Sequence, residues 1–518
     1  MKRTLIALCL ALSLLLAGCL SFLPGNTRFE DMAYVRPDIT AMEEALEKLE
    51  NVIPTATSAK QIMDAFWPFY NLYEAFATAY HLSFAHYAGN MKDIYWSEEY
   101  LYCMENSAWV ESAYDQLLYD LADSPLREAL EGDDYFGPDF FDPYEGDSLW
   151  DETLLALTEK EAEILGDYYD LSAQPMEYTE TYFSTTGAEL EQVFLALIQV
   201  RREIAEYTGY ESYVNYAYEQ LHFRDYTPEQ TAGYLAGVRQ ELVPLYRQLP
   251  AAPAAKPVTE QENLQYLDDL TRDLGGVIRQ AYLSMTDRGL YDIGPGQNKY
   301  PASFELYIYS YQAPYLFLNP TGQTGDQFAL IHEFGHFCND YASYGTYAGA
   351  DVVEVFSQGL EYLSLFYGQK DPQLETYKLR ECLEIFVIQS AYADFEHQVY
   401  DLEDATTEDV RALYAQVLQK YGLCVPGWDS REYVMIPHFF TSPMYIVGYI
   451  FSNDAALQLY QMEAANKTSG TGLYTMHLST QEQTLLRFLE SAHLESPFAE
   501  GRMGKIRATL EEKLFPNA

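Results

Sequence analysis

Five consecutive residues, His332-Glu333-Phe334-Gly335-His336, constrain this chain more than any other feature of its sequence. Side chains four residues apart lie on one face of an α-helix, with β-carbons about 5–6 Å apart. On a helix, both imidazoles could therefore reach one Zn²⁺ at about 2.0–2.1 Å. Glu333 would lie roughly 100° further around the helix, close enough to accept a proton from water on the metal. The motif thus predicts a helix that carries two metal ligands and a general base.

The residues around the motif favour this helix. Residues 326–344 contain no proline, and Thr324-Gly325-Asp326-Gln327 has the spacing of a capping box. We therefore predict a helix that starts just before the motif and stops at Gly345. The alternative is a surface helix with two chance histidines.

A third ligand is expected downstream, because catalytic zinc sites commonly have three protein ligands and His₂Glu is a standard set. Glu354 lies among apolar residues in a helix predicted over 350–367, ending at Gly368. A buried carboxylate needs a partner, and a metal ion is one. Asp351, one turn earlier, is predicted to accept a hydrogen bond from the outer N–H of a ligand histidine. The alternatives are a solvated carboxylate at Glu354 and a helix-dipole acid at Asp351.

These segments resemble the oligoendopeptidase F and thimet oligopeptidase family of zinc metallopeptidases. The likeness rests on HEFGH, on DVVEVFSQGLE at 351–361, on PYLFLNPTGQTGDQFAL at 314–330 and on IPHFFTSPMYIVGYIF at 436–451. GYESYVNYAY at 209–218 also resembles the start of that family's catalytic region. The likeness covers about residues 190–500 and implies one Zn²⁺ per chain, bound by His332, His336 and Glu354. It also implies that Glu333 acts as general base on a zinc-bound water in the hydrolysis of oligopeptides.

The downstream segment carries candidates for oxyanion stabilisation. By resemblance, His438 and Tyr449 stabilise the tetrahedral intermediate, and Tyr445 assists them or binds substrate. Preorganised donors of this kind contribute about 3–4 kcal/mol each. Ser442-Pro443 predicts the N-cap and first residue of a helix that carries both tyrosines on one face. The alternative is structural, because the chain has 47 tyrosines and His438 could be a satisfied core histidine.

Three features depart from the family pattern. Asn339 stands where thimet-type members often have a further histidine, and Phe440 stands where many oligoendopeptidases have a tyrosine. The segment NKYPASF at 298–304 lacks a glycine that is often found there. None of these removes a proposed metal ligand, so they bear on substrate preference rather than on the type of reaction.

The N-terminus predicts export. Lys2 and Arg3 precede an apolar run that is too short for a membrane span, and the run ends in Leu16-Ala17-Gly18-Cys19, which resembles a bacterial lipobox. We predict a lipoprotein signal peptide over 1–18, lipid on Cys19 and a tether over 19–28, so that the protein sits on the extracytoplasmic face of a bacterial cell membrane. The alternative is an ordinary signal peptide with an incidental cysteine.

Charge and cysteines narrow the class of protein further. The formal net charge of −47 disfavours binding to nucleic acid and to anionic lipid surfaces, so the predicted membrane contact depends on the lipid. Cys103, Cys338, Cys382 and Cys424 remain after the predicted cleavage, and export would permit disulfides among them. Their pairing stays open. Cys338 lies two residues after His336 and is expected to face away from the metal.

The expected fold is mainly α. Apolar spacing of three and four residues predicts helices, for example at Val193, Leu197, Val200 and Ile204, and only Phe304–Leu318 has the alternation of strands. The family likeness implies a large helical metallopeptidase with a small β-sheet beside the zinc helix and a deep substrate channel. We predict an N-terminal helical domain over 29–190 and a catalytic domain over 191–518.

Two other functions stay open. One is a non-catalytic peptide-binding lipoprotein, although a binder would have no need of Glu333 as a base. The other is a zinc carboxypeptidase of a related helical fold, which also uses His-Glu-x-x-His and a downstream Glu. The residues from 354 to 361 and from 438 to 449 favour the endopeptidase.

Overall fold

The computed structural model describes residues 26–515, except 134, 139, 145–147, 149, 174–175, 251–254, 347 and 369–371. The predicted signal peptide, Cys19 and the tether up to residue 25 lie outside the described residues. Among the helices that are described, none is long and apolar enough to cross a membrane.

The described chain is mainly helical with one small sheet, as the sequence predicted. The helices in the first half of the chain are α1 (Ile39–Val52), α2 (Ala59–Gly89), α3 (Ile94–Ala122), α4 (Arg127–Glu131), α5 (Glu152–Ser172), α6 (Glu180–Ser184), α7 (Thr186–Tyr207), α8 (Tyr213–Tyr216), α9 (Pro228–Gly237) and α10 (Val243–Tyr246). The second half contains α11 (Glu260–Leu274), α12 (Gly276–Arg288), α13 (Gly325–Ser343), α14 (Ala350–Ser364), α15 (Pro372–Glu384), α16 (Ser390–Val399), α17 (Thr407–Tyr421), α18 (Pro437–Thr441), α19 (Ile446–Ala465), α20 (Ser469–His477), α21 (Leu485–Ser491) and α22 (Arg502–Leu514). The strands are β1 (Tyr291–Asp292), β2 (Phe304–Ile308) and β3 (Ala313–Phe317).

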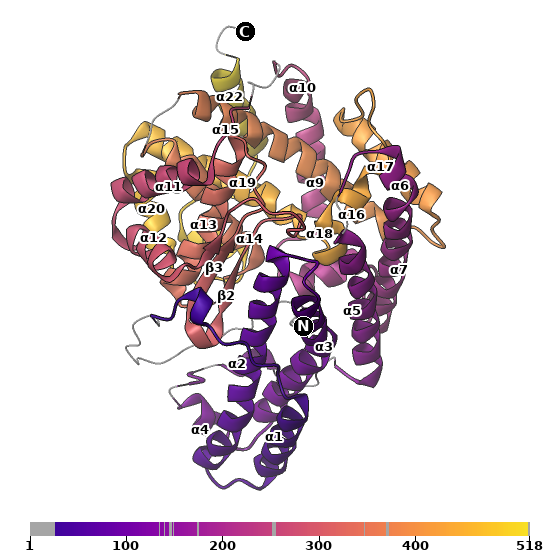
Figure 1. Ribbon diagram of the computed structural model, residues 1–518, viewed down its shortest axis with the longest axis vertical. Helices are drawn as coiled ribbons and strands as arrows, with labels where there is room; N and C mark the ends of the chain where they lie inside the picture. Colours follow the sequence, from indigo (N-terminus) through magenta and orange to yellow (C-terminus); the bar gives the residue numbers. More distant parts are fainter. Residues whose placement is uncertain are drawn as a thin grey trace.

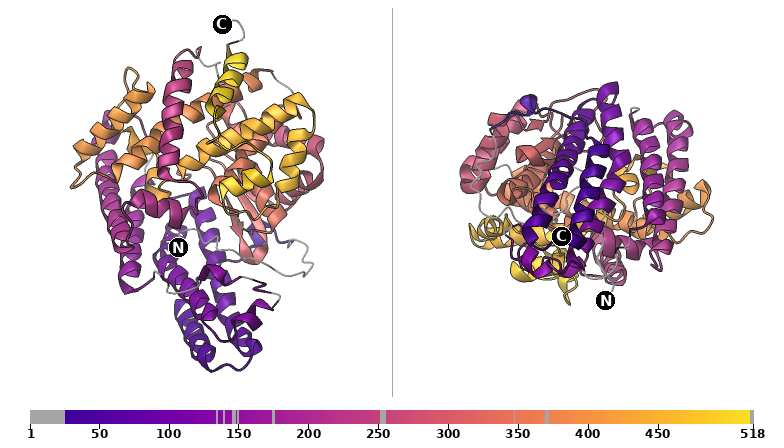
Figure 2. Two further views of the ribbon diagram at one scale, coloured as in Figure 1. Left: turned by 180° about the vertical axis from the view of Figure 1, so that it is seen from behind. Right: turned by 90° about the horizontal axis from the view of Figure 1, so that it is seen from below.

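The N-terminal helices α1–α4 form the lower end of the molecule in Figure 1, and Figure 2 shows the same end from behind and from below. Their core is rich in aromatic rings, such as the stacked pair Tyr73 and Tyr114 at 4.4 Å. The same core includes Tyr307 and Tyr309. His81 of α2 also hydrogen-bonds to the carbonyl oxygen of Tyr307 at 2.6 Å. The N-terminal helices are thus anchored on the end of β2. The predicted boundary at residue 190 falls within α7, and the division into two domains stays a prediction.

The sheet has the order β1-β3-β2, so β2 is an edge strand among the described strands. β2 and β3 pair antiparallel through the 3₁₀ turn Tyr309–Tyr311, which confirms strands within 304–318. Pro314 lies inside β3, where it is paired with Tyr307 of β2. The carbonyl oxygen of Tyr307 faces away from β3, because it accepts the hydrogen bond from His81 of α2. β1 escaped notice because two residues form no periodic pattern.

Three helices form the centre of the fold: α14 packs between α13 and α19. Gly335 permits the contact of α13 with α14, since a β-carbon there would lie 2.5 Å from the Cα of Ser357. The predicted start of α13 is correct, but the predicted capping box is wrong. Thr324 has helical backbone angles and its side chain caps nothing. The Asp326 carboxylate instead accepts hydrogen bonds from the preceding turn, including the Thr321 N–H at 2.8 Å. α14 ends at Ser364, four residues before Gly368.

Candidate metal centre and active site

The structure brings together the three predicted metal ligands. Ligand atoms of His332, His336 and Glu354 lie within 4.8 Å of one another. Oε2 of Glu354 is 3.2 Å from Nε2 of His332 and 3.5 Å from Nε2 of His336. The histidines come from successive turns of α13, and Glu354 comes from α14, which Gly335 allows to approach closely. Two imidazoles and one carboxylate that converge on one point are the donor set of a catalytic zinc site.

The electrostatics of this cluster favour a cation. Glu354 is only 1% exposed, and among the described residues no lysine or arginine forms an ion pair with it. Burial alone would raise the pKa of Glu354, but the two histidines hold it well below its usual value. Burial would likewise lower the pKa of His332, but Glu354 and Glu361 raise it well above its usual value. Buried charges need such compensation, and a divalent metal ion bound between the three side chains would supply it.

Glu333 lies beside this cluster and is 7% exposed. Burial raises the pKa of Glu333 to about 7, although His332 and His336 favour its ionised form. A base whose pKa lies near neutral pH can both accept and return a proton. Its position and its environment therefore fit the predicted general base.

The prediction that Asp351 supports a ligand histidine is wrong. Its carboxylate pairs with Arg224 at 3.1 Å, and it also accepts a hydrogen bond from Tyr226. The outer nitrogen of His332 instead contacts Glu361, with Nδ1 3.0 Å from Oε1. The Asp351 carboxylate is thus occupied by the buried Arg224 and by Tyr226, and not by a ligand histidine.

Glu361 is a site residue that the sequence analysis missed. Its carboxylate is 4% exposed and also binds the fully buried Nζ of Lys378 on α15. Burial alone would raise the pKa of Glu361, but Lys378 and His332 lower it. An ionised Glu361 accepts the Nδ1–H of His332 and leaves Nε2 free for a metal. The spacing could have revealed it, because Glu361 follows Glu354 by seven residues and so shares its helix face.

The predicted oxyanion residues also converge on the cluster. Nε2 of His438 lies 3.0 Å from the Tyr449 hydroxyl, and the Tyr445 hydroxyl donates to Oε1 of Glu354 at 2.7 Å. The Tyr449 ring is 6.3 Å from that of His332. Burial lowers the pKa of His438 and raises that of Tyr449 well above its usual value, so both are neutral donors at neutral pH.

The predicted start of their helix is wrong. α19 begins at Ile446, and Tyr445 is its N-cap residue. Ser442 ends the short helix α18 instead of capping α19, and Met444 has φ +63°, which interrupts any helix between them. Serine followed by proline is a signal for a helix start, but the left-handed residue two positions after Ser442 delays the helix.

The departures from the family pattern have structural roles. The Asn339 side chain is 1% exposed and donates to the carbonyl of Leu478 at 2.7 Å. Phe440 is fully buried and stacks on Tyr168, with ring centres 4.6 Å apart.

Cys338 is buried and free, and Cys103, Cys382 and Cys424 are free as well. The described residues therefore contain no disulfide, and Cys338 is not a member of the metal cluster.

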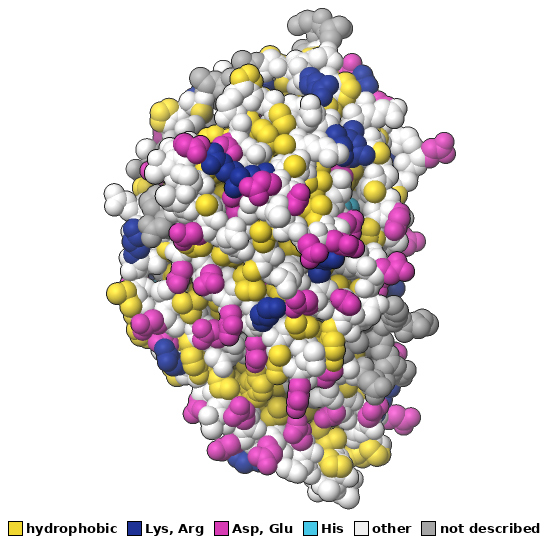
Figure 3. All heavy atoms as spheres, turned by 90° about the vertical axis from the view of Figure 1, so that its right-hand side faces the viewer, with side chains coloured by type: hydrophobic (Ala, Val, Ile, Leu, Met, Phe, Trp, Pro, Cys, Tyr) yellow, Lys and Arg dark blue, Asp and Glu magenta, His cyan; other side chains and the backbone are white. Residues whose placement is uncertain are grey.

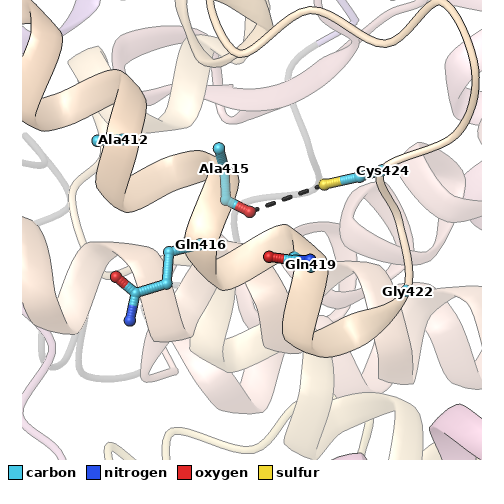
Figure 4. A pocket seen from close by; sticks show the side chains of 6 residues that line it. All are labelled: Ala412, Ala415, Gln416, Gln419, Gly422 and Cys424. Atoms are coloured by element: carbon cyan, nitrogen blue, oxygen red, sulfur yellow. Dashed lines mark hydrogen bonds between the residues drawn. The ribbon is translucent and has the colours of Figure 1, made fainter.

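A pocket elsewhere shares no residue with this cluster. It is a shallow hollow along α17 and the turn that follows it, and Figure 4 shows Cys424 among its lining residues, with Sγ 3.7 Å from the carbonyl oxygen of Ala415. Alanine, glutamine, glycine and cysteine residues line it, and none of them is a histidine or a carboxylate.

Known proteins resemble this chain in sequence and in fold. The peptidase M3 N-terminal domain matches residues 29–148, and peptidase family M3 matches residues 277–480. Oligopeptidase PepF of Bacillus subtilis (strain 168) is 26% identical over 230 residues, which are 40% of this chain and only 33% of that protein.

Solved structures agree over almost the whole chain. A putative oligoendopeptidase F has a TM-score of 0.84 at 20% identity, covering 94% of this chain and 98% of that one. PZ peptidase A with an inhibitor has a TM-score of 0.82 at 19% identity, covering 94% and 99%. A putative oligoendopeptidase F from Bacillus anthracis str. Ames has a TM-score of 0.81 at 20% identity, covering 95% and 98%. At such identities these structures show the fold, while the two matched domains show the family: this chain belongs to peptidase family M3.

Proposed function

We propose that this protein is a zinc-dependent endopeptidase that hydrolyses oligopeptides. The observation that carries the proposal is the convergence of His332, His336 and Glu354 next to Glu333 and the His438–Tyr449 pair. The relatives named above include an oligopeptidase and putative oligoendopeptidases, which supports the substrate class.

The chain's own residues divide the chemistry of peptide hydrolysis among them. Zinc, when bound, would polarise the scissile carbonyl and acidify the attacking water. Glu333 accepts the proton of that water and passes it to the leaving amine. His438 and Tyr449 donate hydrogen bonds to the oxygen on which negative charge develops. Glu361 orients His332 from behind.

β2 offers a surface for an extended substrate. It is an edge strand among the described strands and lies beside α13, and its outer edge presents main-chain groups of alternate residues, of which the Tyr307 carbonyl is already bonded to His81. A peptide could add to this edge through main-chain hydrogen bonds, so that its side chains alternate between the two faces. This arrangement suits an unstructured chain, and the predicted deep channel would exclude folded proteins.

Incubation with peptides and with a folded protein tests the substrate class. We expect metal-dependent cleavage of unstructured peptides of about 5–20 residues, which can lie extended along an edge strand. A folded, protease-sensitive protein should stay intact. A peptide with a blocked C-terminus should be cut internally, which separates an endopeptidase from a carboxypeptidase. Efficient cutting of the folded protein with poor activity on peptides would contradict the oligopeptidase assignment, and binding without any cleavage would favour the non-catalytic peptide binder.

Tyr449→Phe tests the oxyanion assignment. Removal of one preorganised donor should lower kcat by about 10²-fold. KM should change little, because the hydroxyl would meet the oxyanion only in the transition state. Steady-state kinetics on a quenched peptide measure both constants, and Tyr95→Phe, an exposed tyrosine of α3, is the control. If KM alone rises, Tyr449 binds substrate instead.

We further propose that lipid on Cys19 holds the protein at the extracytoplasmic face of a bacterial membrane. The support is the sequence Leu16-Ala17-Gly18-Cys19 after an apolar run. The net charge of −47 disfavours anionic partners, and Figure 3 shows on one face that acidic side chains outnumber the lysines and arginines between them. Mass spectrometry of the mature N-terminus should show lipid on Cys19. The Cys19→Ala variant should lack the lipid and be released from the membrane. A mature protein without lipid would refute the anchor.

A further inference from the structure

A strained residue lies between the two segments that carry the oxyanion donors. Met444 is fully buried and has φ +63°, in the left-handed region that residues other than glycine rarely adopt. It separates α18, which carries His438, from α19, which carries Tyr449. Such a conformation persists only where the surrounding structure holds it.

Buried side chains from other elements hold both main-chain polar groups of Met444. Glu396 of α16 accepts a hydrogen bond from its N–H at 2.9 Å, and Arg224 donates to its carbonyl oxygen at 2.8 Å. His222 also donates to the neighbouring carbonyl of Pro443 at 2.8 Å. None of the three belongs to α18 or α19, so tertiary contacts impose the turn.

The same arginine reaches the helix that carries Glu354. Nε and Nη2 of Arg224 each lie 3.1 Å from the carboxylate of Asp351, one turn before Glu354 on α14. α19 packs against this carboxylate through Gly448, where a β-carbon would lie 2.7 Å from Oδ1 of Asp351. Arg224 therefore joins α14 to the turn before α19, and Gly448 sets how closely the two helices approach.

We propose that Arg224 and Glu396 are positioning residues for the peptidase reaction, which hold Met444 so that Tyr445 and Tyr449 stand in register with the metal ligands. They touch neither the metal cluster nor the oxyanion donors directly, and act through the turn. A misplacement of about 1 Å can cost about 10²-fold in rate. The inference rests on the proposed function.

The first test compares Glu396→Leu with Glu396→Gln. Burial raises the pKa of Glu396 to about 8, so its carboxyl group is mostly protonated at neutral pH, and glutamine keeps the oxygen that accepts the Met444 N–H. We expect Glu396→Gln to retain wild-type kcat. Glu396→Leu should keep its zinc but lose kcat by about 10²-fold, with KM changed less than about twofold. Hydrogen exchange at Met444 should become faster in Glu396→Leu alone, a readout that needs no turnover.

A double-mutant cycle with Tyr449→Phe separates positioning from general damage. If Glu396 acts by placing the Tyr449 hydroxyl, its replacement by leucine should cost less than about threefold once that hydroxyl is gone. The same loss in both backgrounds, or wild-type kcat in Glu396→Leu, would overturn the inference.

If Glu396→Leu does not fold, Gly448→Ala is the second variant that tests the inference. The added methyl group pushes α19 away from Asp351 without removing a charge, and should lower kcat while zinc stays bound. Gly472→Ala is the matched control, because it also lies in a helix and its β-carbon would meet nothing within 4 Å. Wild-type kcat in Gly448→Ala refutes the inference, whereas an inactive wild-type protein refutes the proposed function itself.

Discussion

Glu333→Gln should abolish turnover while zinc stays bound. General acid–base catalysis contributes about 10²–10⁴-fold, and Glu333 would act both as the base in the attack and as the acid for the leaving amine. Glutamine has nearly the same shape but accepts no proton. Cleavage of a quenched peptide library gives the rate, and metal analysis of the same sample gives the zinc content.

Two controls accompany this experiment. Glu490→Gln, an exposed substitution on α21, should leave the rate unchanged. The zinc content should not fall in Glu333→Gln, since Glu333 is not a member of the ligand cluster. Rates near those of the wild type would make Glu333 a structural residue.

His336→Ala should remove both the zinc and the activity. Two ligands remain at a site that commonly needs three, and Glu354 then loses one of the two histidines that favour its ionised form. A ligand that binds only the folded state stabilises it by about 2.7 kcal/mol at a hundred times its Kd. Added zinc should therefore raise the Tm of the metal-free wild type and leave that of the variant unchanged.

The control for this experiment is His493→Asn. His493 is exposed and has φ +54°, which asparagine tolerates, so the variant should keep its zinc. Stoichiometric zinc in purified His336→Ala would refute the ligand assignment, even if activity were lost.

Local periodicity made part of the site predictable. His332 and His336 share a helix face because helix geometry repeats within one turn, and no other part of the chain is needed to place them. Helix ends were less predictable. The sequences at Thr324 and Ser442 have the form of capping signals, but neither residue caps the predicted helix. The Asp326 side chain bonds the turn before α13, and the Met444 N–H bonds Glu396 instead. Capping depends on which partner reaches the free main-chain groups, and that partner can be distant in sequence.

The partners of buried charges depended on tertiary structure. Asp351 and Glu361 both lie on α14 within two turns of Glu354, so the spacing alone allows either to support His332. The structure decides between them, because Asp351 forms an ion pair with Arg224, whereas Glu361 forms one with Lys378 and also contacts His332. A buried carboxylate pairs with the nearest cation or donor, and these arrive from helices far away in the sequence.

The sequence by itself therefore determined the mainly helical fold, the strands within 304–318 and the shared helix face of His332 and His336, because each depends on a short-range repeat. The apolar setting of Glu354 and the ligand count of zinc sites pointed to a third ligand, and the family likeness added His438 and Tyr449. Only the tertiary structure decided that α14 and α19 face α13, that Glu361 orients His332, and that Met444 is held in a left-handed conformation. Those outcomes follow from close approaches at Gly335 and Gly448 and from buried ion pairs, which link residues too far apart for any local pattern to encode.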